Sequence, residues 1–215
     1  MYITVSRPYI MFEVSFISKF MASPTEMHLQ AAKRILRYLK GTINYGIFYK
    51  KNENKQLIAY TDSDYAGDIV DKKSTSGYVF MLSGGVVSWS SKKQPIVTLS
   101  TTEAEFMAAT AYACQAVWMR RILEKLNHKQ EGCTILMCDN SSTIKLSRNH
   151  IMHRRSKHID VRFHFLRDLT RDRVIELVHW GSQDQVADLL TKPIKLQTFE
   201  NLREQLGVCV MPGVN

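Results

Sequence analysis

The stretch YTDSDYAGD, residues Tyr60–Asp68, decides the fold of this chain. It continues an apolar, β-prone run that begins at Leu57, so Asp62 is expected at the end of a strand. An α/β sheet presents its chemistry at the ends of its strands, and Gly67 provides a turn directly afterwards. The stretch therefore predicts a strand that leads into clustered carboxylates.

Three further acids stand at positions that such a sheet can bring together. Glu105 lies early in a predicted helix, Asp139 follows the apolar strand Thr134–Cys138, and Asp188 lies in the second turn of a later predicted helix. Carboxylate oxygens are hard ligands, which suit Mg2+. If these acids converge on Asp62, the four form a site for divalent metal ions.

Each of the three later acids also has an ordinary structural explanation. A capping box can pair Thr102 with Glu105, and Asp139 can be the N-cap of the next helix. Asp188 can stabilise its own helix, because a negative charge near the N-terminus interacts favourably with the helix dipole. Glu105 is the most informative, because it continues the apolar stripe of its helix and a core-facing carboxylate is costly unless it is paired or metal-bound. The stripe consists of Ala109, Tyr112, Ala116, Met119, Leu123 and Leu126.

The composition indicates a globular protein with one main domain and an appendage. The chain has 215 residues, of which 45% are hydrophobic, enough for a substantial core. It has no uncharged apolar run of about 18 residues, and charges interrupt the segment Met1–Met21, so we expect neither a membrane span nor a signal peptide. Four cysteines without a C-x-x-C pair predict reduced core thiols in a protein that stays inside the cell.

The charge of the chain favours a polyanionic partner. The net charge is +9 and the pI about 9.4, which makes nucleic acid the first candidate. Five basic residues near the predicted site can follow phosphates, although solvated surface charge explains each one equally well. These residues are Lys92, Lys93, Arg154, Arg155 and Lys157. The histidines between residues 150 and 164 have no cysteine or acid spaced to complete a tetrahedral zinc site.

Hydrophobic periodicity predicts a mixed sheet. Strands are expected over 46–49, 56–62, 77–82, 86–90, 134–138 and 174–180, and the Gly-rich connection 83–85 makes an antiparallel hairpin. Helices are expected over 28–39, 140–147 and 156–171, and after Gly181. A further, long helix is expected to begin at Ser100, where Ser100 and Glu103 form a capping box. The last two strands need helical crossovers, so they lie parallel to the strand at 56–62. The predicted fold class is α/β, with three antiparallel and two parallel strands flanked by helices, behind an N-terminal appendage.

Five segments resemble, in the same order, signatures of the ribonuclease H domain of copia-type LTR retrotransposon Pol polyproteins. They are Tyr60–Asp68, Ser74–Tyr78, Ser100–Phe106, Lys157–Asp160 and Ala187–Pro193. Residues 7–8, 24–28 and 32–42 are similar to the segment that joins the family's reverse transcriptase to this domain, so the resemblance covers nearly the whole chain. Family members often have Trp at the position of Tyr65 and Asp at that of Tyr9, and neither departure concerns a metal ligand.

The resemblance implies a ribonuclease H fold in which Asp62, Glu105, Asp139 and Asp188 are both the catalytic residues and the metal ligands. Two Mg2+ ions, which Mn2+ can replace, would act in the endonucleolytic hydrolysis of the RNA strand of RNA–DNA hybrids. Asp62 would bridge both ions, Glu105 and Asp139 would hold one, and Asp188 the other. His179 lies in a predicted strand, so it is not assigned the role of the loop histidine of cellular ribonucleases H.

The resemblance also divides the chain. Residues 1–54 are expected to be a remnant of the reverse transcriptase connection or thumb, 55–200 the ribonuclease H-like domain, and 201–215 a C-terminal tail. The chain has no aromatic-x-Asp-Asp motif, so no polymerase activity is expected. We interpret it as a fragment of a polyprotein whose partners are an RNA–DNA hybrid and the rest of the reverse transcriptase, in the cytoplasm within a virus-like particle or in the nucleus.

Other functions stay open at this point. A catalytically silent nucleic-acid-binding remnant would keep the fold and the charge without turnover, and in a protein-interaction module the acids would only cap helices. An integrase-like nuclease would act on DNA, but the order of the acids and the lack of a His/Cys zinc segment count against it. Intact acids favour the ribonuclease. No lysine or arginine directly adjoins the acids in the sequence, and we expect no basic neighbour at the site. The acids should therefore repel one another without metal.

Overall fold

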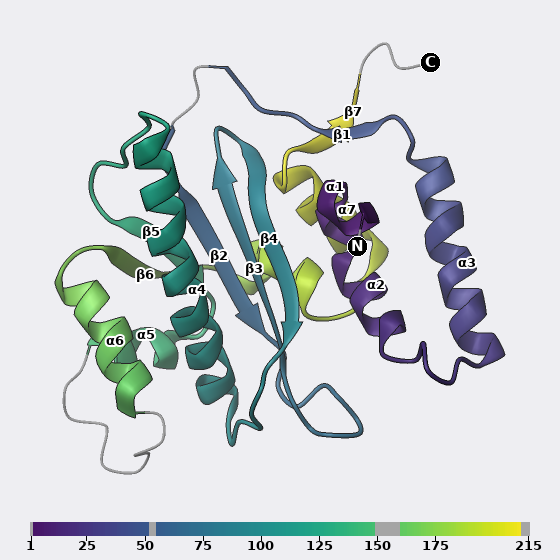
Figure 1. Cartoon of the computed structure of the whole chain (residues 1–215), viewed down its shortest axis with the longest axis horizontal. Helices are drawn as coiled ribbons and strands as arrows, with labels where there is room; N and C mark the ends of the chain where they lie inside the picture. The colour runs from purple at the N-terminus through teal and green to yellow at the C-terminus, as the bar shows by residue number, and fades with distance from the viewer. Residues whose placement is uncertain (1, 52–54, 149–159, 212–215) are drawn as a thin grey trace.

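A mixed sheet forms the centre of the protein in the computed structural model, which describes residues 2–51, 55–148 and 160–211. From one edge to the other its strands are β4 (Gly85–Lys93), β3 (Thr75–Leu82), β2 (Ile58–Ser63), β5 (Thr134–Cys138) and β6 (Ile175–His179) (Figure 1). The pairs β2–β3 and β3–β4 are antiparallel, whereas β2–β5 and β5–β6 are parallel. The predicted fold class is confirmed.

Helices cover both faces of this sheet (Figure 1). One face carries α4 (Thr101–Lys125), α5 (Ser141–Arg148) and α6 (Asp160–Arg171). The opposite face carries elements from both ends of the chain. These are α1 (Tyr2–Ser6), η1 (Pro8–Ile10), α2 (Met11–Ser18), η3 (Val186–Leu190) and α7 (Leu196–Gln205). Each face buries a hydrophobic core of its own, so the sheet is covered on both sides.

Alternation along β2 directs its polar end toward both layers. Leu57 and Ala59 pack in the core beneath α4, whereas Tyr60 packs against the core on the opposite face. Because side chains alternate along a strand, Asp62 points toward η3 while Ser63 belongs to the α4 face. The end of β2 therefore presents polar groups to the elements on both faces of the sheet.

A glycine in β3 brings η3 close to Asp62. Gly77 is the register partner of Asp62 in the β2–β3 pair. A Cβ atom at Gly77 would lie 2.7 Å from Leu190 Cβ and 2.9 Å from Thr191 Cγ2, distances that a well-packed core does not allow. The missing side chain therefore lets the end of η3 lie directly on the sheet.

We expect Gly77→Ala to destabilise the protein by about 1 to 3 kcal/mol, as overpacking usually does. For a chain of this size, each kcal/mol lowers Tm by roughly 2–4 °C. Gly41→Ala is the matched control, because an added methyl group there meets no atom within 4 Å. Thermal unfolding of both variants checks the prediction, and equal Tm values would contradict the close approach of η3.

The structure corrects the prediction of a continuous helix after Gly181. The chain instead forms two short 3-10 turns, η2 (Ser182–Asp184) and η3, separated by Gln185 with φ −78° and ψ 94°. The Gln185 side chain accepts a hydrogen bond from Ala187 N at 3.4 Å and donates one to Thr61 O at 3.1 Å. A bond to β2, rather than helical periodicity, therefore sets the position of Asp188.

The two ends of the chain meet outside the main sheet. β1 (Tyr45–Ile47) pairs antiparallel with β7 (Val208–Val210), and the periodicity predicts neither β7 nor α7. α3 (Glu26–Gly41) begins with a capping box between Thr25 and His28 and ends at Gly41, so it extends two residues beyond each end of the predicted helix 28–39. The domain boundaries at residues 54 and 200 remain predictions.

Two further expectations concern membranes and cysteines. Among the helices that the structure describes, none combines the length and the apolar character needed to cross a membrane. All four cysteines carry free thiols. Only Cys138 is buried, whereas Cys114 and Cys209 are exposed, so the prediction of core thiols is wrong for those two.

Candidate metal centre

Asp62, the last residue but one of β2, is the centre of the site. Its side chain is 2% exposed, accepts a short hydrogen bond from the Thr191 hydroxyl, and has Oδ2 3.6 Å from Lys192 Nζ. The same ammonium lies 3.0 Å from Oδ1 of Asp188, which is buried in η3. Lys192 therefore bridges two buried carboxylates on the η3 face of the sheet.

Glu105 reaches the same strand end from the opposite face. The Ser100 hydroxyl accepts a hydrogen bond from Glu103 N at 3.1 Å, so the helix cap lies at Ser100 as predicted and the alternative cap at Thr102 is wrong. This phase turns Glu105 toward β2, where its Oε1 accepts a hydrogen bond from Ser63 N at 3.1 Å. Its Oε2 is buried and has no hydrogen-bond partner among the described residues. A buried carboxylate oxygen without a donor is costly, and it is suited to a cation.

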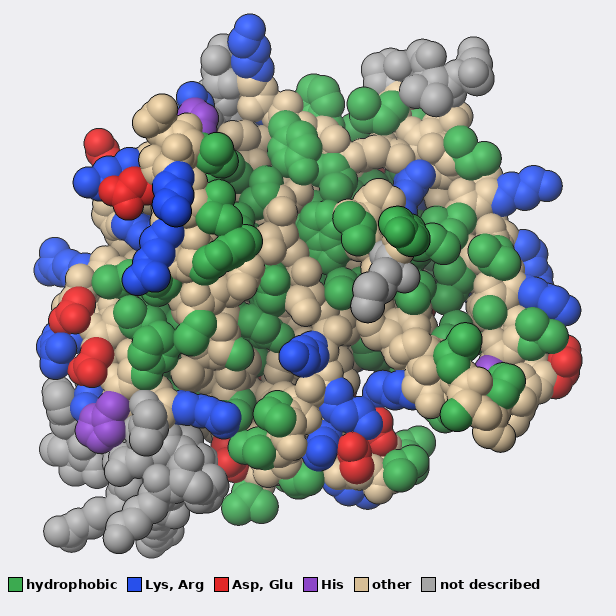
Figure 2. Space-filling view, in the orientation of Figure 1, with side chains coloured by type: hydrophobic (Ala, Val, Ile, Leu, Met, Phe, Trp, Pro, Cys, Tyr) green, Lys and Arg blue, Asp and Glu red, His purple; other side chains and the backbone are tan. Residues whose placement is uncertain are grey.

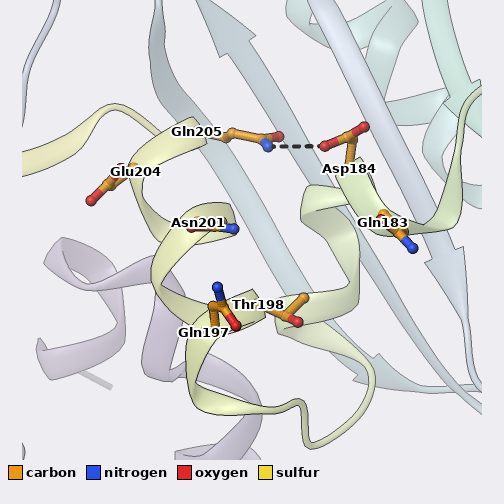
Figure 3. Close-up of a pocket in the computed structure, with 7 residues that line it drawn as sticks. All are labelled: Gln183, Asp184, Gln197, Thr198, Asn201, Glu204 and Gln205. Atoms are coloured by element: carbon orange, nitrogen blue, oxygen red, sulfur yellow. Dashed lines mark hydrogen bonds between the residues drawn. The ribbon is translucent and has the colours of Figure 1, made fainter.

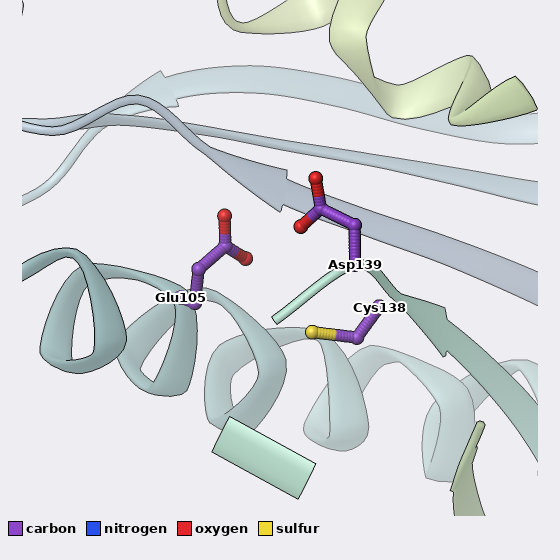
Figure 4. Close-up of side chains that lie close together, drawn as sticks. All are labelled: Glu105, Cys138 and Asp139. Carbon is purple, nitrogen blue, oxygen red and sulfur yellow. The ribbon is translucent and has the colours of Figure 1, made fainter. Parts of the chain in front are cut away.

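Asp139 lies directly after β5, beside β2, and is partly buried. Its Oδ2 accepts a hydrogen bond from the Ser182 hydroxyl at 3.0 Å. The helix-cap alternative is wrong for this residue, because Thr143 N donates to the side chain of Asn140 at 3.0 Å. The neighbouring residue caps α5, and the carboxylate of Asp139 is left to point toward that of Glu105 (Figure 4).

Burial and mutual repulsion shift the pKa values of two of these acids, Glu105 and Asp188, upward. Burial, followed by the charges of Asp62 and Asp139, raises the pKa of Glu105 well above its ordinary value. Burial, followed by Asp62, raises the pKa of Asp188 to about 7, although Lys192 opposes this shift. Burial lowers the pKa of Lys192, but the charges of Asp62 and Asp188 outweigh it and raise the pKa overall. The four predicted acids thus form one electrostatic unit.

The prediction that no basic residue neighbours the acids is wrong. Lys192 follows Asp188 by four residues, the spacing of neighbours on one helical face, and Nζ is within ion-pair distance of two of the four acids. The repulsion that we expected between the acids is therefore partly offset within the chain.

The predicted phosphate-binding residues divide into three groups. Lys92 is exposed on β4. Lys93 is 2.5 Å from Asp68 and 3.1 Å from Asp71, and its hydrogen bond holds the pKa of Asp68 well below the ordinary value. Arg154, Arg155 and Lys157 lie outside the described residues.

A cluster of charged side chains ties the N-terminal segment to the sheet. Asp68 forms an ion pair with Lys19, at 3.2 Å, in addition to the one with Lys93. Figure 2 shows acidic and basic side chains gathered at the end of the sheet where the loop between β2 and β3 emerges. Asp68 of the stretch that opens the site is therefore a structural residue, and it does not contact the four acids in the part of the chain described.

Sequence reasoning also overlooked Gln94. Its Nε2 lies within hydrogen-bond distance of Ser63 Oγ (3.1 Å), Ser76 Oγ (2.7 Å) and Ala104 O (2.9 Å). It joins β2, β3 and the first turn of α4, and so holds Glu105 in place relative to Asp62. A glutamine before a proline carries no signal of such a role in the sequence.

A separate polar depression, of about 740 Å3, lies between η2 and α7 (Figure 3). Glutamine and other polar side chains line it, and Gln205 Nε2 donates a hydrogen bond to Asp184 Oδ1 at 3.4 Å. None of the four acids lines this depression, so it is not part of the candidate metal centre.

Comparison with known proteins places this fold and site in a family. No family model matches the chain. It is 42% identical over 211 residues to the retrovirus-related Pol polyprotein from transposon RE1 of Arabidopsis thaliana, and 41% identical over 204 residues to that from transposon TNT 1-94 of Nicotiana tabacum. The alignments cover 98% and 94% of this chain, but only 14% and 15% of the two polyproteins.

A distant likeness to solved structures accompanies these matches. The chain superimposes on LC11-RNase H1, solved in complex with an RNA/DNA hybrid, with a TM-score of 0.47 and 16% identity. The superposition covers 63% of this chain and 94% of that one.

The five-stranded mixed sheet, flanked by helices and carrying acids at the ends of adjacent parallel strands, defines a ribonuclease H-like α/β protein. The chain belongs to the retrovirus-related Pol polyproteins of copia-type transposons and spans a small part of the length of the relatives it matches.

Proposed function

We propose that this chain is a ribonuclease H that hydrolyses the RNA strand of RNA–DNA hybrids endonucleolytically, as part of retrotransposon replication. The observation that carries the proposal is the convergence of Asp62, Glu105, Asp139 and Asp188 from both faces of the sheet on the end of β2. The membership of the Pol family supports the choice of nucleic acid as substrate.

The residues present fit divalent metal ions. Glu105 Oε2 is buried without a hydrogen-bond partner among the described residues, and a bound cation would relieve the repulsion that raises the pKa values of Glu105 and Asp188. In this proposal the four carboxylates would hold two Mg2+ ions, with Asp62 as the shared ligand, Glu105 and Asp139 as ligands of one ion, and Asp188 as a ligand of the other. When bound, the ions activate the attacking water and stabilise the leaving oxygen.

The chain orients three of the four proposed ligands, each through one of its two oxygens. Thr191 engages Oδ2 of Asp62, Ser63 N engages Oε1 of Glu105, and Ser182 engages Oδ2 of Asp139. Such bonds restrict the rotation of a carboxylate and direct its other oxygen toward the ion. We propose that these three donors are positioning groups for the metal ligands.

The proposed partners are the hybrid itself and the remainder of the reverse transcriptase. The positive charge of the chain favours the hybrid, and we propose that exposed Lys92 contacts its backbone. Contacts to 2′-hydroxyl groups distinguish the RNA strand from the DNA strand. We place the activity in the cytoplasm, within a virus-like particle, or in the nucleus.

Incubation of the purified chain with an end-labelled RNA–DNA hybrid tests this proposal. With Mg2+ or Mn2+ we expect internal cleavage of the RNA strand, and with chelator none. Double-stranded DNA and single-stranded RNA of the same sequence are the controls and should stay intact. A folded protein that binds the hybrid but leaves it intact would instead support the alternative, a catalytically silent nucleic-acid-binding remnant.

Without metal, the protein should lose stability as the pH rises from about 4 to about 7. The pKa of Asp188 rises from 3.8 to about 7 on folding, so in this interval the folded state binds more protons than the unfolded state, and the free energy of unfolding falls as the pH rises. Glu105 shifts in the same direction. Glu13, whose pKa burial raises to about 7, adds to the loss from a position in α2.

Thermal unfolding in chelator and in Mg2+, at about pH 5 and about pH 7.5, measures this effect. We expect Mg2+ to remove the share of Asp188 and Glu105 and to leave that of Glu13, so the loss of stability with pH becomes shallower. An equal loss of Tm in chelator and in Mg2+ would contradict the prediction.

A further inference from the structure

A cysteine lies beside two of the four acids. Cys138, the last residue of β5, is wholly buried and packs in the core beneath α4. Its sulfur, one carboxylate oxygen of Glu105 and one of Asp139 lie within 4.8 Å of one another. Figure 4 shows the three side chains, one from α4 and two from the end of β5, gathered around a common space.

Two observations indicate that this group can take a ligand. Glu105 is 5% exposed, and its Oε2 has no hydrogen-bond partner among the described residues. Among the residues that the structure describes, the Cys138 sulfur makes one long contact, 3.9 Å, with the carbonyl oxygen of Asn140, and no strong hydrogen bond there competes for it. Glu105 therefore offers a buried oxygen without a hydrogen-bond donor, and it lies beside the Cys138 thiol, whose own hydrogen bond is weak.

We propose that Glu105, Cys138 and Asp139 form a binding site for one thiophilic divalent ion, such as Zn2+ or Cd2+. Thiolate sulfur favours these ions, whereas Mg2+ takes oxygen ligands. The ion replaces the thiol proton, which passes to solvent.

The geometry suits such an ion. Zn2+ binds sulfur at about 2.3 Å and carboxylate oxygen at about 2.0–2.2 Å in a tetrahedral arrangement, so its ligands lie within roughly 4 Å of one another. Separations of at most 4.8 Å in the metal-free protein require only small adjustments of the side chains. Three protein ligands leave a fourth position for water or for a phosphate oxygen.

This site shares Glu105 and Asp139 with the proposed Mg2+ site, so the two kinds of ion compete. A thiophilic ion bound there would inhibit hybrid cleavage, a consequence that rests on the proposed function. The binding itself does not depend on it. Hence a direct binding measurement separates failure of the thiophilic site from failure of the ribonuclease proposal.

Titration with Cd2+, followed by the ultraviolet absorption of cadmium–thiolate charge transfer, tests the site. We expect the wild-type protein to bind one tight equivalent with this absorption. Cys138→Ser should lose the absorption at that equivalent and bind Cd2+ at least about tenfold more weakly, since even the loss of an outer-shell partner of a metal site costs that much. Excess Mg2+ should raise the apparent Kd of the wild-type protein for Cd2+.

Cys133→Ser is the matched control. Cys133 lies just before the other end of β5, where its sulfur is 3.6 Å from a carboxylate oxygen of Glu176, and the described part of the chain supplies no third ligand there. The exposed Cys114 and Cys209 stay in every variant as a constant background. Cys133→Ser should bind Cd2+ as the wild type does.

A second variant, Cys138→Ala, tests the same residue if Cys138→Ser fails to fold. Cys138→Ala places no hydroxyl group in the core, and circular dichroism with thermal unfolding identifies which Cys138 variants are folded. If a folded Cys138 variant keeps the wild-type absorption and affinity, the proposal is overturned.

Discussion

Asp62→Asn should lower the rate of hybrid cleavage by a factor of at least about 1,000, equivalent to roughly 4 kcal/mol in the activation barrier. Asp62 stands between the acid from α4 and the acid from η3, and an amide cannot supply the negative charge of a bridging ligand. The fold should survive, because asparagine keeps an oxygen for the Thr191 hydroxyl and no longer repels Glu105 and Asp188. We expect Tm to change by less than roughly 4 °C.

Asp68→Asn is the control, since it makes the same change in the same stretch of sequence. Asp68 holds Lys93 and Lys19 and does not touch the other acids of the site among the described residues, so cleavage should stay near the wild-type rate. Its ion pairs are partly exposed, and their loss should lower Tm by only roughly 2–4 °C. Cleavage assays and thermal unfolding of both variants are the measurement. Equal losses of activity would show that Asp62 has no special role.

Lys192→Met should have the largest effect on stability among the substitutions of charged residues at the site. Without metal, the buried carboxylates of Asp62 and Asp188 would lose their counter-ion. Breaking a fully buried pair costs about 3 to 5 kcal/mol, but Lys192 is 40% exposed, so solvent screening reduces the expected cost to about 1 to 2 kcal/mol. This corresponds to a fall in Tm of roughly 2–8 °C.

Mg2+ should restore more stability to Lys192→Met than to the wild type. The variant site carries one more net negative charge, so it should bind cations more tightly, and ligand binding to the folded state raises Tm by mass action. Lys195→Met removes an exposed lysine three residues later and should behave as the wild type does. Melting curves of the three proteins, each in chelator and in Mg2+, provide the comparison. The same Mg2+ gain in all three would rule out Lys192 as the counter-ion of the site.

The sequence alone predicted the sheet and the four acids because those features depend on short-range patterns. An apolar run before Asp62 and another before Asp139 predict two strands with acids at their ends, whatever the rest of the chain does. The cap at Ser100 sets the phase of α4, and that phase turns Glu105 toward the sheet. These interactions span a few residues, so periodicity and capping rules are sufficient to find them.

Only the tertiary structure decided how the last acid is held and what surrounds it. Gln185 bonds to Thr61, and Thr191 bonds to Asp62, across more than a hundred residues of sequence in each case. The same packing sets Lys192 between two acids and depends on the space left by Gly77. No local pattern encodes such contacts, because each requires that η3 first be laid against a sheet built from distant strands.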